Sequence, residues 1–165
     1  MNIHPVWLLL LSIFLNACSQ PTKSSNQSKP TSPQTILAIF AHPDDETTVG
    51  PILAKYSKTA DVYLILATDG FLGVTEHAGI PAGDSLVKVR EKEAACSCAA
   101  LGIHPPIFFG LPDALGLDGS LDFYQHVPVY KEKLMQEIQR LKPDVIITFG
   151  PDGDSGHPDH RLVGA

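Results

Sequence analysis

Short apolar runs alternate along the chain with segments of helical periodicity. Each apolar run is rich in branched or aromatic side chains, which is typical of a strand buried on both faces of a parallel sheet. The runs lie at residues 35–40, 62–67, 106–109 and 145–149. Strands that alternate with helices favour an α/β fold in which right-handed crossovers join parallel strands. We therefore predict an α/β domain with a parallel sheet flanked by helices.

Helices are expected between these strands, at residues 49–58, 85–101 and 128–141. Pro51 has to lie in the first turn of its helix, because a proline further inside would remove a backbone hydrogen bond. Gly102 directly follows the second helix and suits its C-terminal cap. In the third helix, one face carries the apolar side chains of Tyr130, Leu134, Ile138 and Leu141.

The first residues resemble the leader of a bacterial lipoprotein. Residues 6–15 form an apolar run interrupted only by Ser12, which has the length of a secretory signal and is too short to span a membrane. Residues 15–18, Leu-Asn-Ala-Cys, then resemble a lipobox, in which Cys18 is lipidated and becomes the mature N-terminus. The resemblance implies a lipid-anchored protein of the cell envelope, at the outer membrane or the outer face of the plasma membrane.

Two other interpretations of this segment stay open. It contains no Lys or Arg before Cys18, so it could be an ordinary secretory leader cleaved near Ala17, or a buried helix. Residues 19–34 carry only polar residues and proline and cannot bury a core, so we expect a flexible tether. The predicted organisation is a leader at 1–18, a tether at 19–34 and one domain at 35–165.

Length and charge indicate one domain and exclude one class of partner. The 165 residues suffice for one domain, and the formal net charge of −6 lies entirely after the leader. An acidic surface without a basic stripe repels phosphate backbones, so we expect no nucleic-acid partner.

Cys96 and Cys98 lie two positions apart in a predicted helix, where their side chains point to nearly opposite faces. We expect small buried thiols there and no mutual disulfide.

A polar cluster follows the C-terminal end of each predicted strand. The clusters lie at residues 42–46 (His-Pro-Asp-Asp-Glu), 68–70, 110–113 and 150–160. In open α/β sheets, ligands bind in the crevice outside the carboxyl ends of the strands. We therefore expect the clusters to converge on one rim of the sheet.

Two of these clusters contain residues that suit a catalytic metal. His42 and Asp45 lie on a proline-containing turn, and residues 156–160 (Gly-His-Pro-Asp-His) offer further imidazoles. Two histidines and one carboxylate leave a coordination position open for water, as in catalytic zinc sites. Asp44 would then be free to act as a base. The alternative is structural, because acidic residues 44–46 would also suit the first turn of the following helix.

The sequences AHPDDE, at 41–46, and HPDH, at 157–160, resemble the motifs of the PIG-L family of zinc-dependent de-N-acetylases, also called LmbE-like proteins. The resemblance covers residues 35–165 and implies a Rossmann-like fold that hydrolyses the amide of N-acetylglucosamine conjugates. It implies zinc ligands at His42, Asp45 and His160 and a general base at Asp44. It also implies that His157 donates a hydrogen bond to the oxyanion and that Asp159 orients a histidine. The resemblance further implies sugar contacts at Arg90 and Asp113. The last two could equally be a surface charge on a helix and a turn residue.

The reaction that this resemblance implies is metal-assisted amide hydrolysis. Zinc would polarise the acetyl carbonyl, Asp44 would accept the proton of the attacking water, and His157 would steady the oxyanion. Either Asp44 or His157 would then protonate the departing amine. Two other activities stay open, namely an amidase on another N-acyl conjugate and a tethered sugar- or metal-binding lipoprotein without turnover.

The chain departs from the family pattern after the second motif. It stops at Ala165, whereas the family continues through a helix and further strands. We interpret residues 162–165 as the beginning of that helix, and we expect the C-terminal part of the domain to be missing and the edge at the last strand to be uncovered. The remaining histidines match neither motif and are expected in the leader, in loops or on the surface: His4, His77, His104 and His126.

Overall fold

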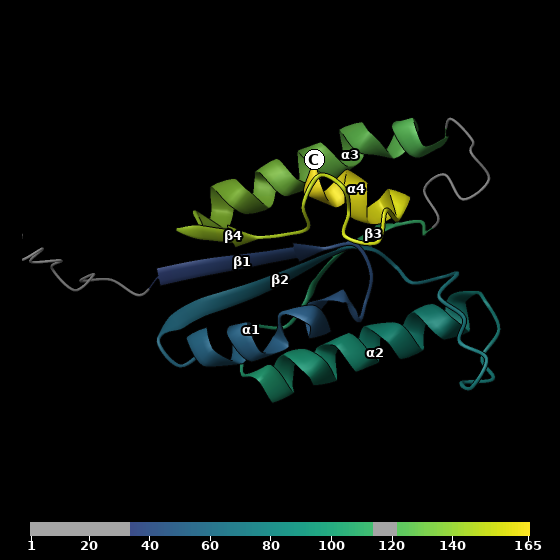
Figure 1. Ribbon diagram of the computed structural model, residues 1–165, viewed down its shortest axis with the longest axis horizontal. Coiled ribbons are helices and arrows are strands. Elements are labelled where there is room, and N and C mark those ends of the chain that lie inside the picture. The colour runs from purple at the N-terminus through teal and green to yellow at the C-terminus, as the bar shows by residue number, and fades with distance from the viewer. Residues whose placement is uncertain (1–33, 114–121) are drawn as a thin grey trace, which may run out of the picture. The chain divides into compact units, whose positions relative to one another are not determined.

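The computed structural model describes residues 34–113 and 122–165. Strands and helices alternate along the chain (Figure 1), and their bounds are β1 Gln34–Phe40, the 3₁₀ helix η1 Asp45–Thr48, α1 Gly50–Tyr56, β2 Ala60–Thr68, α2 Asp84–Leu101, β3 Ile107–Leu111, α3 Asp122–Leu141, β4 Val145–Ile147 and α4 Pro158–Gly164. The predicted leader with Cys18 lies outside the described residues. Among the helices that are described, none is long and apolar enough to cross a bilayer.

The four strands form one parallel sheet in the order β3-β2-β1-β4. β1 pairs with β2 along its whole length and with β4 from Ile36, opposite Val145, to Ala38, opposite Ile147. A central strand that is covered on both faces needs apolar side chains on both, which explains the continuous apolar run of β1. The predicted α/β fold, a Rossmann-like parallel sheet flanked by helices, is confirmed.

Helices cover both faces of this sheet, with α1 and α2 on one side and α3 and α4 on the other (Figure 1). Because successive side chains of a strand point to opposite faces, β1 contributes to both cores. Leu37 and Ile39 pack with α3 and α4, while the other core joins α1 and α2 to Ile36, Ala38 and Phe40. The C-terminal end of β1 is therefore held from both sides and forms a rigid base for the residues that follow.

The helices differ from the sequence-based expectation mainly at their starts. α3 begins at Asp122, so Pro128 lies inside the helix and not at its first position. Packing of the predicted apolar face against the sheet, with Tyr130 buried, outweighs the one backbone hydrogen bond that the proline removes. Pro51 does lie in the first turn of α1, and Gly102 caps α2 with φ 71°, as predicted.

The two helical cysteines have different environments. Cys98 is buried, and burial raises the pKa of its thiol to about 12. Cys96 is exposed, so the expectation that both thiols are buried was wrong for this residue. The reason is the helical geometry itself, since two positions along α2 turn the side chain from the sheet to solvent. Both cysteines are free, which agrees with the expected lack of a mutual disulfide.

Candidate metal centre

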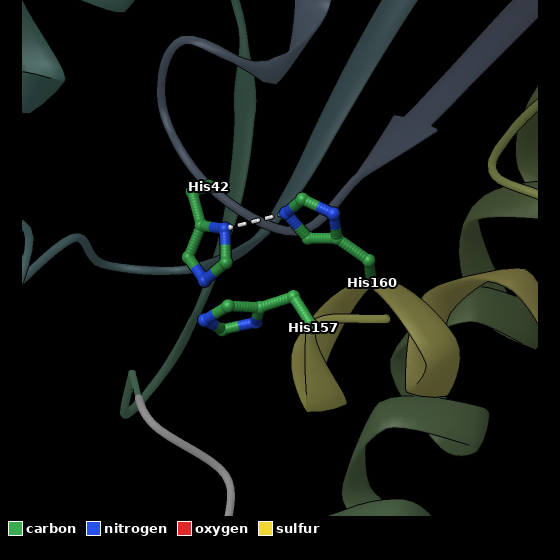
Figure 2. Close-up of side chains that lie close together, drawn as sticks. All are labelled: His42, His157 and His160. Carbon is green, nitrogen blue, oxygen red and sulfur yellow. Dashed lines mark hydrogen bonds between the residues drawn. The ribbon is translucent and has the colours of Figure 1, made fainter. Parts of the chain in front are cut away.

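Three imidazoles meet at the C-terminal end of the sheet, and Figure 2 shows them facing one another. His42 follows β1 directly, whereas His157 and His160 belong to the start of α4. In α4, His157 is the N-cap, Pro158 occupies the first turn, and His160 lies three positions on, so both imidazoles point from one side of the helix. Because β1 and β4 are neighbours in the sheet, the segment after β4 reaches the loop after β1.

Two imidazoles and one carboxylate form a donor triangle, in which each of the two imidazoles faces a different oxygen of Asp45. His42 Nδ1 lies 3.2 Å from His160 Nε2 and 3.5 Å from Asp45 Oδ2, and His160 Nε2 lies 3.3 Å from Asp45 Oδ1. Two ligands of a tetrahedral zinc ion with bonds of about 2.0–2.1 Å are about 3.3–3.4 Å apart. The triangle therefore has the size and the donor set that a divalent metal such as zinc requires.

In both His42 and His160, the ring nitrogen that lies outside the triangle faces a fixed hydrogen-bond acceptor. His42 Nε2 lies 2.9 Å from Asp159 Oδ2, and His160 Nδ1 lies 3.2 Å from the carbonyl oxygen of Gly153. Each of these nitrogens donates its hydrogen, so in the neutral form of each ring the lone pair of His42 Nδ1 or His160 Nε2 points into the triangle. Outer partners of this kind orient and strengthen histidine ligands of metals.

His157 is close enough to be considered as a third histidine ligand. The three imidazoles offer nitrogen atoms that all lie within 4.8 Å of one another. However, His157 Nδ1 accepts the backbone N–H of Asp159 at 3.2 Å, so in the neutral ring the hydrogen is on Nε2. Burial and the nearby charge of His42 lower the pKa of His157, which favours that neutral ring. His157 is therefore arranged as a hydrogen-bond donor to the cleft.

Asp45 and His42 support each other electrostatically. The carboxylate of Asp45 accepts the backbone N–H groups of Ala41 and His42, at 3.1 and 2.8 Å. Burial alone would raise the pKa of Asp45, but hydrogen bonds from His42 outweigh it and lower the pKa. Burial alone would likewise lower the pKa of His42, whereas the carboxylates of Asp159 and Asp45 raise it to about 10. The carboxylates of Asp45 and Asp159 thus favour a positive charge at the position of His42.

Asp44 lies beside the triangle and takes no part in it. Its Oδ2 accepts a hydrogen bond from Arg90 Nη2 at 3.1 Å, and its side chain is 55% exposed. Partial burial raises the pKa of Asp44, although the Arg90 charge opposes the shift. The alternative that the acidic residues suit a helix start holds in part: Asp45 and Glu46 lie in the first turn of η1, but the side chain of Asp44, its N-cap, makes no cap hydrogen bond, and the first turn of α1 has no acidic residue.

The triangle opens into a cleft of about 300 Å³, in which residues from the predicted clusters converge as expected. It is lined by His42, Asp44, Asp45, Gly70, Leu72, Gly73, Arg90, Asp113, His157 and His160. Asp159 is fully buried beneath it. Sequence reasoning missed Leu72 and Gly73, which follow the 68–70 cluster and had no distinctive signal of their own.

Asp113 holds the loop that follows β2. Its Oδ1 accepts the backbone N–H of Gly70 at 3.0 Å, and its Oδ2 accepts that of Leu72 at 2.8 Å. Arg90 adds a hydrogen bond of 3.4 Å to the carbonyl oxygen of Gly73. Both residues line the cleft where a substrate contact was expected, but each also shapes the cleft through the backbone of this loop.

Comparisons with known proteins identify the family of this chain. The profile of a family described as "PIG-L: GlcNAc-PI de-N-acetylase" matches residues 37–165. A 1D-myo-inositol 2-acetamido-2-deoxy-alpha-D-glucopyranoside deacetylase from Mycobacterium sp. (strain KMS) is 34% identical over 76% of this chain and 46% of its own length. The Thermobifida fusca protein of the same name is 32% identical over 76% of this chain and 50% of its own length. The chain thus spans about half the length of these relatives.

Solved structures share the fold. An N,N'-diacetylchitobiose deacetylase from Pyrococcus horikoshii superposes with a TM-score of 0.62 and 27% identity, covering 79% of this chain and 46% of that one. A 4-carboxy-2-hydroxymuconate hydratase from Pseudomonas putida KT2440 has a TM-score of 0.61 and 18% identity, covering 79% of this chain and 52% of that one, so it shares the fold alone. The family profile, in contrast, spans both histidine-containing motifs of the cleft. The chain therefore belongs to the PIG-L family.

Proposed function

We propose that this chain is a zinc-dependent hydrolase that removes the acetyl group from an N-acetylglucosamine-type sugar conjugate. The observation that carries the proposal is the donor triangle of His42, Asp45 and His160, with sides of 3.2–3.5 Å, beside a carboxylate that is not part of it. A site with three protein ligands and one open position is typical of catalytic zinc. The relatives named as sugar deacetylases supply the substrate class.

His42, Asp45 and His160 would hold the metal, while Asp159 and the carbonyl of Gly153 orient the two imidazoles. Zinc, when bound there, supplies Lewis acidity for the acetyl carbonyl and lowers the pKa of water. We assign the zinc to this set and not to the three imidazoles, because Nδ1 of His157 is engaged by a backbone N–H.

Asp44 would act as the general base. Its carboxylate lines the cleft next to the triangle, and Arg90 holds it in place through one of its oxygens. Asp44 accepts a proton as water attacks the acetyl carbon. His157 donates its Nε2 hydrogen to the oxygen of that carbonyl, where negative charge develops in the transition state. A proton carried by Asp44 or His157 then passes to the departing amine.

The sugar itself would lie toward Arg90 and Asp113, which line the same cleft. The Arg90 side chain is only 17% exposed and bonds to Asp44 and to the Gly73 carbonyl, so these contacts hold it in place. Asp113 contributes by holding the loop after β2, whose Leu72 and Gly73 also line the cleft. The substrate is an N-acetylated sugar, and we expect no nucleic-acid partner.

Acetate release tests this proposal directly. The purified chain with one equivalent of zinc should release acetate from N-acetylglucosamine derivatives, and a chelator should abolish the release reversibly. Faster release of acyl groups from N-acyl conjugates without a sugar would favour the amidase alternative. Zinc binding and sugar binding without any product would instead indicate a binding lipoprotein.

We also propose that Cys18 is lipidated and anchors the protein in the cell envelope, at the outer membrane or the outer face of the plasma membrane. The support is the sequence Leu-Asn-Ala-Cys after an apolar run, followed by a polar tether. Cys18→Ser should block processing or release the protein from membranes, as measured by fractionation and intact mass. Ser19→Ala is the matched control and should leave both unchanged. Equal membrane partitioning and processing of Cys18→Ser and wild type would overturn the proposal.

A further inference from the structure

Glu46 is a buried carboxylate that the proposed reaction does not use. It lies in the short helix η1 with a relative exposure of 1%, and its Oε2 accepts the backbone N–H of Asp44 at 3.0 Å. Taking an ionisable side chain out of water is unfavourable unless its partners compensate, so a buried glutamate needs an explanation. The partner here is the backbone of the residue proposed as the general base.

The backbone of Asp44 adopts a conformation that residues other than glycine rarely adopt. Its φ is 119° and its ψ is −22°. Such a conformation persists only where the surroundings hold it, and it occurs preferentially at functional sites. Glu46 binds the Asp44 N–H, while the carbonyl of Asp44 accepts hydrogen bonds from Thr47, from N–H at 3.0 Å and from Oγ1 at 2.6 Å. The peptide groups on both sides of Asp44 are therefore fixed.

We propose that Glu46 is a positioning residue for the Asp44 base, an inference that rests on the proposed function. By holding the Asp44 N–H, the buried carboxylate keeps this backbone in its unusual conformation and directs the Asp44 side chain toward the cleft and Arg90. Glu46 itself lines a separate hollow of about 170 Å³ and is not among the residues that line the larger cleft. It acts through Asp44 and does not touch the reacting groups.

The test compares three variants of the full chain. Glu46→Met fills the site without an acceptor, Glu46→Gln keeps an acceptor oxygen of nearly the same shape, and Glu132→Ala removes an exposed carboxylate of α3 that lines neither the cleft nor the smaller hollow. For each variant we would measure the hydrogen exchange and proton chemical shift of the Asp44 amide by NMR, the zinc content, the melting temperature, kcat and KM.

In the wild type and in the variants Glu46→Gln and Glu132→Ala, we expect a protected Asp44 amide and similar kcat values. In Glu46→Met, we expect the protection to be lost and kcat to fall by about 10–10²-fold, because displacing a catalytic group by about 1 Å can cost about 10²-fold. Zinc content and KM should stay unchanged, which separates positioning from general support of the metal loop.

Three results would overturn the proposal: an unprotected Asp44 amide in the wild type, a Glu46→Met variant with normal kcat, or a loss of activity in Glu46→Met that follows loss of zinc. The amide measurement needs no turnover. If the wild type released no acetate, the proposed function would fail, while the exchange of the Asp44 amide would still decide whether Glu46 holds it.

Discussion

Asp44→Asn should keep its zinc and its fold while kcat falls by roughly 10²–10⁴, the usual contribution of a positioned general base. The physical reason is geometric, because Asp44 lies beside the donor triangle and bonds to Arg90 at 3.1 Å, so the amide preserves the shape but cannot accept the proton. Zinc content by elemental analysis, melting temperature and the rate of acetate release would test this. Added zinc should not restore the rate.

Asp45→Asn is the matched control, since it makes the same chemical change at the neighbouring position. The carboxylate of Asp45 lies 3.5 Å from His42 Nδ1 and 3.3 Å from His160 Nε2, within the proposed zinc site. Its loss should therefore lower the affinity for zinc. If Asp44→Asn lost zinc while Asp45→Asn kept it, the two roles would be reversed. Normal acetate release by both variants would mean that the chemistry takes place elsewhere.

His42→Ala and His160→Ala should abolish activity because each removes a proposed metal ligand. We expect zinc affinity to fall by more than the roughly 10–10²-fold that the loss of an outer partner costs. Excess zinc should restore part of the activity. Zinc at 100 times its Kd should stabilise the wild type by about 2.7 kcal/mol through mass action, and this stabilisation should disappear in both variants at the same zinc concentration. Calorimetric titration and thermal melting would measure the two effects.

His157→Ala is the control that separates the two possible ligand sets. Its Nδ1 accepts a backbone N–H, so its loss should leave zinc affinity nearly unchanged while it removes a donor to the oxyanion. A drop in zinc affinity in His157→Ala as large as that in His42→Ala would instead favour coordination by the three imidazoles, which also lie close enough together.

The positions of the elements and of the polar clusters could be read from the sequence. The runs that became β1 and β2 are continuous and apolar because both faces of a central parallel strand are covered. Pro51 and Gly102 marked the beginning and the end of helices through their backbone preferences alone. Polar residues directly after the strands had to lie at one edge of a parallel sheet, which predicted the cleft. These features depend on local geometry that a short segment determines by itself.

Which residues touch one another was decided only by the tertiary structure. Pairing of β1 with β4 brings His160 to His42, and no local pattern specifies that strand order. Asp159 was expected to orient a histidine, and the structure places it 2.9 Å from His42 Nε2 but 3.9 Å from His157 Nδ1.

Two further carboxylates have contacts that only the tertiary structure shows. For Asp113, a sugar contact and a turn residue were equally compatible with the sequence, and the structure shows that both of its oxygens bind the loop after β2. Glu46 was read as a residue of a helix start, and only its burial and its bond to Asp44 distinguish it from an exposed acid. A sequence motif by itself does not determine which groups its side chains contact. The partner of a side chain depends on how segments that are distant in sequence pack against each other.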